Sequence, residues 1–525
     1  MTSQNQETKS WRDAGRALLN PRVLGMLFLG FSAGLPILLI FGTLSVWLTE
    51  AGVEKSSVTF FSWAALGYSF KYVWAPLVDR LPIPVLSNRM GRRRSWLLAA
   101  QIAVATSMVW MGISDPTDSL TMVGLAAVML GFSSATQDIV IDAYRIEAVS
   151  KELQAMMSST YVAGYRMGML LGGAGALKLA SIFSKVEGYD PTAWALAYGC
   201  MALSMTVGIV TTLLIKEPDS YSAKTASLRS TADYVRFLGL FVLVASTFTA
   251  GFVLTAATAE SFKRVLTEDY GLVPRLSGFL VETVRLASSV GLAALAGWVA
   301  ILLRAAPAAM LRETYVDPFA DFVRRYGRSA ILLLLLIGTY RISDIVLGAV
   351  ANVFYLDVGF TKDQIAAISK TYGLFMTLAG GFVAGFMAVR YGVIRTLYLG
   401  ALLSSVTNLL FAYLATVGNS EWLLIAVITA DNLAGGIATT AFIAYLSSLT
   451  NFSFTATQYA LFSSIMTLGP KLLAGYSGML VESLGYSTFF IGTALIGLPV
   501  LVLVNMAGKI DEAAAPESTE EPPDG

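Results

Sequence analysis

The sequence predicts an all-α integral membrane protein, built from two six-helix bundles with an extra helix pair between them. Of the 525 residues, 55% are hydrophobic and only 14% are charged, whereas a soluble domain carries roughly 25% charged residues. The mean hydropathy is +0.66. About 14 apolar runs approach the 20 or so residues that a membrane-spanning helix needs, and they are grouped as six, two and six.

Composition also excludes several classes of function. The net charge of +1 gives no reason to expect a nucleic-acid partner, and a single cysteine excludes an intramolecular disulfide. Histidine is absent, which removes the commonest metal ligand and the ordinary general base. We therefore expect no metal, no cofactor and no catalytic residue, so the chain is predicted not to be an enzyme. The first apolar run is too long to be the core of a signal peptide.

The predicted elements follow one another in a regular order. A polar N-terminus at 1–22 precedes the first bundle at 23–215, a linker occupies 216–328, the second bundle occupies 329–508, and an acidic tail at 509–525 is expected to be disordered. The first bundle holds spans at 23–48, 57–78, 95–113, 120–142, 155–180 and 193–215. The linker holds two more, at 237–258 and 284–304. The second bundle holds spans at 329–356, 364–389, 394–416, 422–446, 456–483 and 487–507.

Lysine and arginine residues indicate the orientation of these spans. Most of the 36 basic residues fall on one side when the spans are numbered in order, and the side rich in positive charge is cytoplasmic. This places both termini in the cytoplasm. It also requires the middle pair to cross out and back, which preserves the orientation of the second bundle. Two six-span halves indicate a transporter built from repeated bundles.

Charged residues interrupt the fourth span near its end. Asp138 and Asp142 are four residues apart and share one helical face, with Gln137 beside them and Arg145 within pairing reach of Asp142. A charge at the bilayer centre costs about 2.5–3.5 kcal/mol on insertion scales, so it normally faces a partner or a water-filled cavity. For Asp142, Arg145 and Glu147 a structural reading stays open, as ion pairs at the cytoplasmic helix end. Asp138 lies one turn deeper, and we expect it to carry a proton, with Asp142 as a further candidate.

Basic residues within the first bundle are candidates for binding anionic cargo. Arg166 lies in the fifth span beside Tyr165, and its planar guanidinium suits a carboxylate. The alternative is an ion pair with one of the aspartates of the fourth span. Lys71 lies in the second span near Tyr68, although a lysine there can also extend to the end of its helix. Gln137, Tyr165 and Tyr68 are further candidates for contact with cargo.

The second bundle offers matching positions. Lys471 follows Gly-Pro in its fifth span, where a broken helix opens backbone groups to a cavity. Arg341 and Asp344 are three residues apart, so they form either a structural ion pair or a cargo site with a proton carrier. Asp431 and Asn432 correspond roughly to Gln137 and Asp138, and we expect Asp431 to couple protons and Asn432 to contact cargo.

Each bundle has a basic loop between its second and third spans, at 75–94 and 380–395. The first loop resembles motif A of the major facilitator superfamily, with Ala75 in place of its first glycine and an insertion before GRRR. The residues that match it are Asp79, Arg80, Gly91, Arg92 and Arg93. The resemblance implies a role in gating. In the second loop Gly385 stands where the motif has an acid.

Longer stretches resemble the AmpG muropeptide permeases: FSAGLPILLIFGTLSVWL, FKYVWAPLVDR, GRRRSWLL, SSATQDIVIDAYRIE and YVAGYRMGMLLGGAGAL. The resemblance covers nearly the whole chain, and the twelve-plus-two span count is similar to that of the Pseudomonas-type members. It implies an inner-membrane importer of N-acetylglucosaminyl-1,6-anhydro-N-acetylmuramyl peptides that is driven by protons. The expected partners are this cargo, protons and the lipid bilayer, and we expect a monomer.

Three other functions remain as alternatives. One is a related permease for a siderophore or acetyl-CoA. Another is a membrane-embedded enzyme such as a lipid transferase, which the missing histidine and the absence of a soluble catalytic loop oppose. The third is a passive channel or scaffold, which buried charges of both signs oppose.

Overall fold

The computed structural model describes residues 11–53, 68, 71–150, 153–186, 188–218, 231–303, 305, 309, 312–474 and 476–514. Within these residues the secondary structure is helical, with no strand. The chain divides into two compact units, one made of Met1–Ser220 with Phe322–Gly525 and the other of Tyr221–Asp321. Eleven helices among the described residues are long and apolar enough to cross a membrane.

The first half of the larger unit runs from α1 to α13. Its helices are α1 (Trp11–Leu18), α2 (Pro21–Ile40), α3 (Gly42–Glu50), η2 (Lys71–Val73), α6 (Ala75–Arg80), α7 (Leu86–Met90), α8 (Arg92–Ile113), α9 (Leu120–Glu147), α10 (Gln154–Leu170), η4 (Leu171–Gly175), α11 (Ala176–Phe183), α12 (Pro191–Ser204) and α13 (Thr206–Leu214). Most of the second predicted span, at 57–78, lies outside the described residues.

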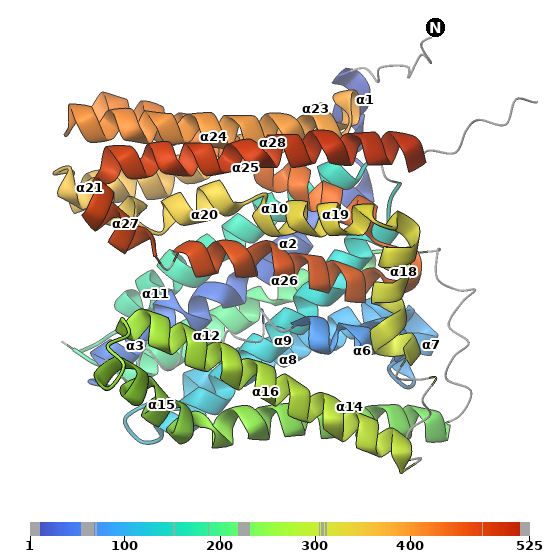
Figure 1. Ribbon diagram of the computed structural model, residues 1–525. Helices are drawn as coiled ribbons and strands as arrows, with labels where there is room; N and C mark the ends of the chain where they lie inside the picture. Colours follow the sequence, from blue (N-terminus) through green and yellow to red (C-terminus); the bar gives the residue numbers. More distant parts are fainter. Residues whose placement is uncertain are drawn as a thin grey trace, which may run out of the picture. The chain divides into compact units, whose positions relative to one another are not determined.

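The second half repeats this plan. After α18 (Asp317–Tyr326) come α19 (Ser329–Thr339), α20 (Ile342–Gly348), α21 (Ala351–Asp357), α22 (Lys362–Gln364), η7 (Ile365–Tyr372), α23 (Gly373–Tyr391), α24 (Val393–Val417), α25 (Glu421–Leu449), η8 (Phe452–Phe454), α26 (Thr455–Ala474), α27 (Ser477–Leu484) and α28 (Tyr486–Ala514). Figure 1 shows the long helices of this unit running roughly parallel, with α1, α6 and α7 toward one end and α3, α11 and α21 toward the other.

Helix starts share capping features in two pairs of spans. Asn20 and Asp190 each precede a proline at the first helical position, and their side chains accept backbone N–H bonds from α2 and α12. Such caps satisfy the donors that a helix start leaves open, and proline is suited to that position. Gly91 (φ +85°) and Gly392 (φ +87°) begin α8 and α24 in the same left-handed conformation. The Gly91 and Gly392 pair shows the internal repeat in backbone geometry as well as in sequence.

Close packing of α2 against α10 depends on glycine. A Cβ on Gly30 or Gly34 would overlap a carbonyl oxygen of α10, and a Cβ on Gly164 or Gly168 would overlap one of α2. Small residues allow membrane helices to approach to backbone contact. In the second half the corresponding close approach is between α23 and α25, where Gly436 contacts the carbonyl of Thr377. In the described part of the chain, glycine thus allows close approach in both halves, at α2–α10 in the first and at α23–α25 in the second.

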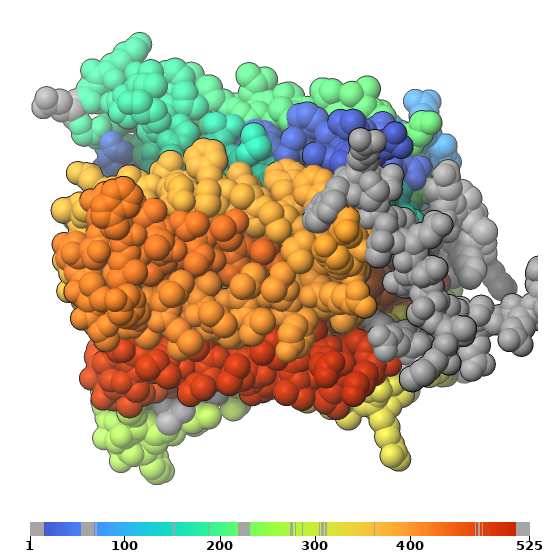
Figure 2. Space-filling view, turned by 90° about the horizontal axis from the view of Figure 1, so that it is seen from above, coloured from blue at the N-terminus to red at the C-terminus, as the bar shows by residue number. Residues whose placement is uncertain are grey.

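The halves meet along two lines, where α10 packs against α23 and α25 and where α26 packs against α6 and α9. On the outer surface, α24 and α28 lie side by side (Figure 2), and they expose apolar side chains such as Tyr413 and Val502. The fifth-span helix from Gln154 to Phe183 is not among the eleven apolar candidates. Its Ser158, Ser159 and Thr160 are buried, as expected for a helix that faces protein rather than lipid.

The smaller unit contains η6 (Arg312–Val316) and three longer helices, α14 (Thr231–Leu254), α15 (Ala256–Glu268) and α16 (Pro274–Leu302). Two of the eleven candidate spans, Ala232–Leu254 and Leu280–Leu302, belong to it. At one end of the α14–α16 pair, the Arg285 guanidinium lies 3.9 Å from the centre of the Phe252 ring and 3.0 Å from Glu282. This cluster joins the two helices.

Candidate functional site

The last four turns of α9 are enclosed by protein. Every residue from Ser133 to Glu147 is buried, including the charged ones. The predicted span ended at 142, whereas the helix continues to Glu147. Arg145 and Glu147 form the ion pairs expected at this helix end, Arg145 with Asp142 and Glu147 with Arg93 of the basic loop, and both side chains are buried within the unit.

Asp142 is the centre of a buried ion-pair network. Its carboxylate lies 3.5 Å from the Lys71 Nζ and 3.3 Å from the Arg145 guanidinium. Arg145 also donates to the hydroxyls of Ser158 (3.0 Å) and Ser447 (2.8 Å). Ser447 belongs to α25, so this guanidinium connects the two halves. Its central carbon is also 5.0 Å from the ring centre of Tyr459 on α26.

Asp138 lies one turn further into the helix and differs from Asp142. Its Oδ1 is buried and has no hydrogen-bond partner among the described atoms. Lys71 and Asp142 act on it electrostatically, and the phenol groups of Tyr161 and Tyr165 are within the same range. A buried carboxylate without a direct partner is costly, so this group is suited to exist with and without a proton.

Two tyrosines predicted to touch cargo lie in this region. The Tyr68 hydroxyl donates to Ser134 at 2.7 Å, on α9. Tyr165 is half-buried, and its ring packs 5.9 Å from that of Tyr161. Gln137 points elsewhere, because its amide contacts the Ser32 hydroxyl of α2 at 3.5 Å. The structure therefore places Gln137 in the α2–α9 contact and not beside Asp138.

Arg166 and Arg341 come from opposite halves and lie close enough to repel one another. Within the described part of the chain, Arg166 has neither an ion pair nor a hydrogen bond. It therefore does not form the alternative ion pair with an aspartate of α9. Arg341 pairs with Asp344 at 3.0 Å and donates to Thr439 at 2.6 Å. The structure thus brings two guanidinium groups near one another, of which Arg341 has a carboxylate partner.

The remaining candidate residues of the second half differ in whether they lie near the Arg341–Asp344 pair. Asp431 is within electrostatic range of Asp344 and Arg341. Asn432 instead joins two helices, accepting from the Thr377 hydroxyl of α23 at 2.8 Å and donating to the Ile428 carbonyl at 3.0 Å. The side chain of Lys471 lies outside the described ones. The structure thus gathers Asp344, Asp431 and Arg341 and leaves Asn432 in helix packing.

A second buried network closes the end of the unit that carries α6 and α7. The Asp79 carboxylate accepts from the Ala456 N–H (3.1 Å), the Thr457 N–H (2.8 Å) and the Thr457 hydroxyl (2.7 Å), at the start of α26. Arg93 joins Asp79 (2.9 Å) to Glu147. A helix N-terminus attracts negative charge, so this carboxylate holds the second half against the first.

The other residues of the basic loop support this contact. Arg92 donates to the Asp79 carbonyl, and the Arg80 guanidinium lies 5.8 Å from the Phe454 ring centre. Gly91 accommodates the Glu217 carboxylate, which accepts the N–H groups of Arg93 (2.7 Å) and Arg94 (3.0 Å). A side chain at 91 would collide with Glu217, so glycine is required there for space as well as for its positive φ.

Sequence reasoning missed several of these groups. Ser158, Ser447 and Tyr459 bind Arg145, but single hydroxyls within apolar spans carry no distinguishing signal. The sequence does indicate the place of Thr457. A run of Asn, Ser and Thr before an apolar helix marks a helix N-terminus, and helix N-termini attract anions. Gly385, where motif A has an acid, packs against Ser159 of α10, so the second half makes this contact by packing and not by charge.

Comparison with known proteins gives two family models and several relatives. The model described as Acetyl-coenzyme A transporter 1 matches residues 23–216, and that described as Major Facilitator Superfamily matches 332–524. AmpG 4 of Rickettsia conorii is 32% identical over 92% of this chain and 95% of its own length. The anhydromuropeptide permease of Escherichia coli K12 is 28% identical over 93% of this chain and 80% of its own.

Solved structures are similar in fold. The proton:xylose symporter XylE has a TM-score of 0.56 at 12% identity, covering 95% of this chain and 96% of its own. The E. coli fucose:proton symporter FucP has a TM-score of 0.58 at 10% identity, covering 93% and 98%.

Proposed function

Because the chain belongs to the AmpG family within the major facilitator superfamily, we propose that it imports N-acetylglucosaminyl-1,6-anhydro-N-acetylmuramyl peptides across the bacterial inner membrane, driven by the proton gradient. The observation that carries the proposal is the buried set of opposite charges on α9 and its neighbours, in a chain whose relatives include an anhydromuropeptide permease. Both termini are proposed to be cytoplasmic, with bundles at 23–215 and 329–508 and the extra pair in the linker 216–328.

Cargo recognition is assigned to the basic groups of the interior. Muropeptides carry carboxylates, and a guanidinium binds a carboxylate through two parallel hydrogen bonds. Arg166 and Arg341 supply one such group from each half, and Lys71 and Lys471 are the further cations proposed for this role. Tyr68 and Tyr165 offer ring faces and hydroxyls to a sugar, and Gln137 and Asn432 are the amides proposed from the sequence. Cargo that bridges the two arginines would offset their repulsion and favour closure around it.

Proton coupling is assigned to the carboxylates Asp138, Asp344, Asp431 and Asp142. Asp138 is the first choice because its Oδ1 lacks a partner, while Asp142 is held by Lys71 and Arg145. Protonation of Asp138 would remove its electrostatic attraction for Lys71, which already pairs with Asp142. A ligand shifts a conformational equilibrium only through different affinities for the two states, and this change of charge beside the Lys71–Asp142 pair provides such a difference.

Uptake by proteoliposomes tests the proposal. A labelled anhydromuropeptide is supplied with and without an inward proton gradient, and saturable accumulation that requires the gradient is expected. Saturable uptake that does not depend on the gradient would support the proposed cargo and contradict the proposed proton coupling. No uptake by a folded protein would reject the cargo.

A matched pair of variants tests the arginine site. Charge-assisted hydrogen bonds are worth about 1.5–3 kcal/mol each, so Arg166→Gln is expected to raise the KM for uptake about tenfold or more. Arg264→Gln, which removes an exposed arginine of α15, serves as control and is expected to leave the KM unchanged. Equal KM values for the two variants would show that Arg166 does not bind the cargo.

The match of residues 23–216 to the acetyl-coenzyme A transporter model supports a second candidate, import of a coenzyme A thioester. Such cargo is anionic through phosphates and not through carboxylates. A competition assay in the same proteoliposomes distinguishes the muropeptide from the coenzyme A thioester as cargo. Inhibition of muropeptide uptake by unlabelled muropeptide but not by acetyl-CoA supports the first proposal, and uptake of labelled acetyl-CoA itself would support the second.

A further inference from the structure

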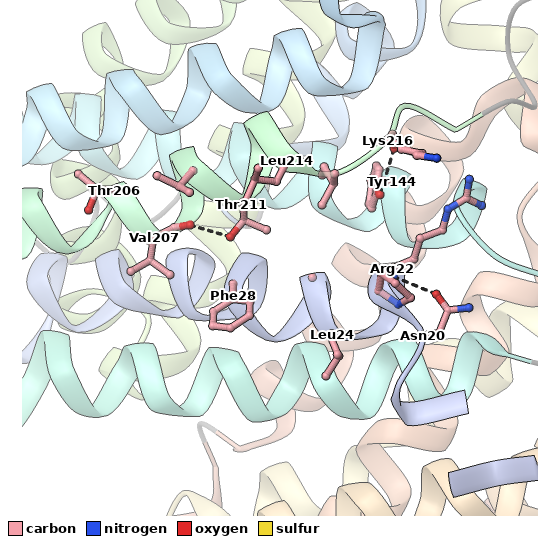
Figure 3. Close-up of a pocket in the computed structure, with 14 residues that line it drawn as sticks. Asn20, Arg22, Leu24, Phe28, Tyr144, Thr206, Val207, Thr211, Leu214 and Lys216 are labelled. Carbon is pink, nitrogen blue, oxygen red and sulfur yellow. Dashed lines mark hydrogen bonds between the residues drawn. The ribbon is translucent and has the colours of Figure 1, made fainter. Parts of the chain in front are cut away.

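A groove of about 980 Å³ lies between the start of α2 and the end of α13, away from the charged interior. Its apolar lining includes Leu24 and Phe28 from α2 and Val207, Val210 and Leu214 from α13, all of them exposed. Figure 3 labels Leu24 and Phe28 on α2 and Val207 and Leu214 on α13. The volume is at the upper end of the 300–1,000 Å³ that small-molecule sites occupy.

One end of this groove is basic. Arg22 and Lys216 line it there, with Asn20 beside them, whereas Thr206 and Val207 lie at the opposite end (Figure 3). Arg22 donates to the carbonyl of Ala148, which lies beyond the end of α9. Lys216 is exposed, and its backbone carbonyl accepts from Tyr144 at 3.2 Å. The two cations therefore lie at the same end of the groove.

The location of the two cations relative to the bilayer identifies the ligand. Arg22 is at the start of the candidate span Pro21–Glu50, and Lys216 is two residues past the candidate span Pro191–Leu214. Both are thus at a membrane–water boundary, while the apolar lining extends into the hydrocarbon region. Basic pockets between membrane helices bind anionic lipid head groups.

We infer that this groove is a binding site for one anionic phospholipid of the surrounding leaflet. The phosphate lies against Arg22 and Lys216, and one acyl chain lies along Phe28, Val210 and Leu214. The occupant has to combine a negative head with an apolar tail, and this excludes a soluble anion and a neutral lipid. The site does not depend on the identity of the cargo, because it is separate from the interior charges.

Native mass spectrometry of the full-length protein in detergent tests this with dioleoyl phosphatidylglycerol and dioleoyl phosphatidylcholine as probes. The wild type is expected to retain one phosphatidylglycerol at concentrations where phosphatidylcholine is lost. A basic residue near the surface contributes about 1 kcal/mol to such binding, so Lys216→Gln should weaken it about fivefold. Val210→Trp fills the apolar part and should reduce retention while leaving both charges in place.

The control removes one positive charge outside the groove. Lys509, an exposed residue near the end of α28, does not line it, and Lys509→Gln should bind phosphatidylglycerol as the wild type does. Equal retention of the two lipids, or unchanged retention in both Lys216→Gln and Val210→Trp, overturns the inference. A protein dimer that Val210→Trp abolishes would assign the groove to a second copy of the chain and would overturn it too.

Discussion

At the residue scale, Asp138 and Asp142 differ although they share one face of α9. Asp142 has two cationic partners, whereas the Oδ1 of Asp138 has none among the described groups. Two cations therefore hold the Asp142 carboxylate in place, whereas a buried carboxylate oxygen without a hydrogen-bond partner is costly. The geometry therefore favours Asp138 over Asp142 as the first candidate for proton coupling.

The variant Asp138→Asn tests this difference directly. It keeps the shape of the side chain and removes its titration, so gradient-driven accumulation is expected to fall to background while counterflow exchange of labelled cargo continues. Asp118→Asn, in an exposed loop, is the control and should retain both activities. Loss of both activities in a folded Asp138→Asn protein would instead assign Asp138 to binding or gating.

Asp115, in the loop between α8 and α9, gives a prediction on pH. Partial burial raises the pKa of its carboxyl, but bonds from Thr117 (2.9 Å) and the Tyr189 hydroxyl (2.8 Å) outweigh this and hold the pKa below its usual value. A group with a lowered folded-state pKa stabilises the fold above its unfolded pKa, about 3.9, and that contribution is lost as pH falls through the folded value.

Asp115→Asn should therefore lower the Tm in detergent at neutral pH, and the difference from the wild type should shrink as the pH falls from about 5 toward 3. Differential scanning fluorimetry over this range measures it. The exposed Asp118→Asn again serves as control. A Tm difference that stays constant with pH would show that the Asp115 charge does not contribute through these bonds.

At the element scale, helix contacts in this protein depend on which glycine faces a neighbour. Gly435 and Gly436 are adjacent in α25, but a Cβ on Gly436 would overlap the Thr377 carbonyl, whereas a Cβ on Gly435 would meet nothing within 4 Å. Polar side chains add specificity, as when Asn432 joins α25 to α23. Packing of membrane helices depends on such contacts because helices in lipid have no hydrophobic driving force for association.

This neighbouring pair makes a matched test. Gly436→Ala should lower stability by about 1–3 kcal/mol, the usual cost of overpacking, and should reduce the Tm in detergent. Gly435→Ala should be neutral or slightly stabilising, since alanine is the better helix former. Similar Tm values for the two variants would show that α23 can move away from α25 without loss.

Much of this architecture could be predicted from the sequence. Apolar runs of about 20 residues report membrane spans directly, and eleven described helices meet the same requirement. The spacing of Asp142 and Arg145 predicted their ion pair, which is present at 3.3 Å. Contacts between spans could not be predicted. Gln137 follows the pattern of a site residue yet binds Ser32 of α2, because one step along a helix turns a side chain by about 100°.

At the scale of the whole larger unit, charge is buried where the two halves meet. Asp79 accepts three bonds from the start of α26, and Arg145 reaches Ser447 of α25. These contacts exist only when this end is closed, so they oppose opening there. A transporter that exposes its site to both sides must break them in every cycle.

Asp79→Asn should shift this equilibrium. Hydrogen bonds to a charged group contribute about 1.5–3 kcal/mol, so loss of the charge should increase the open population about tenfold or more. Spin labels at Arg89 and Phe452, both exposed and in different halves, report the distance in a Cys200→Ser background. A longer-distance population in Asp79→Asn is expected. The same distance distribution as in the parent protein would contradict the role of Asp79.

The two lines of contact between the halves differ in chemistry, and this has a mechanical consequence. Along α6–α26 the contact is made by charge at Asp79, whereas along α10–α23 Gly385 packs directly against Ser159. The hydrogen bonds that Asp79 accepts from α26 depend on the charge of its carboxylate, whereas the packing of Gly385 against Ser159 involves no charged group. We therefore expect the rotation axis to run along α10–α23, so that opening is a hinged movement about that line and not a symmetric parting of equal halves.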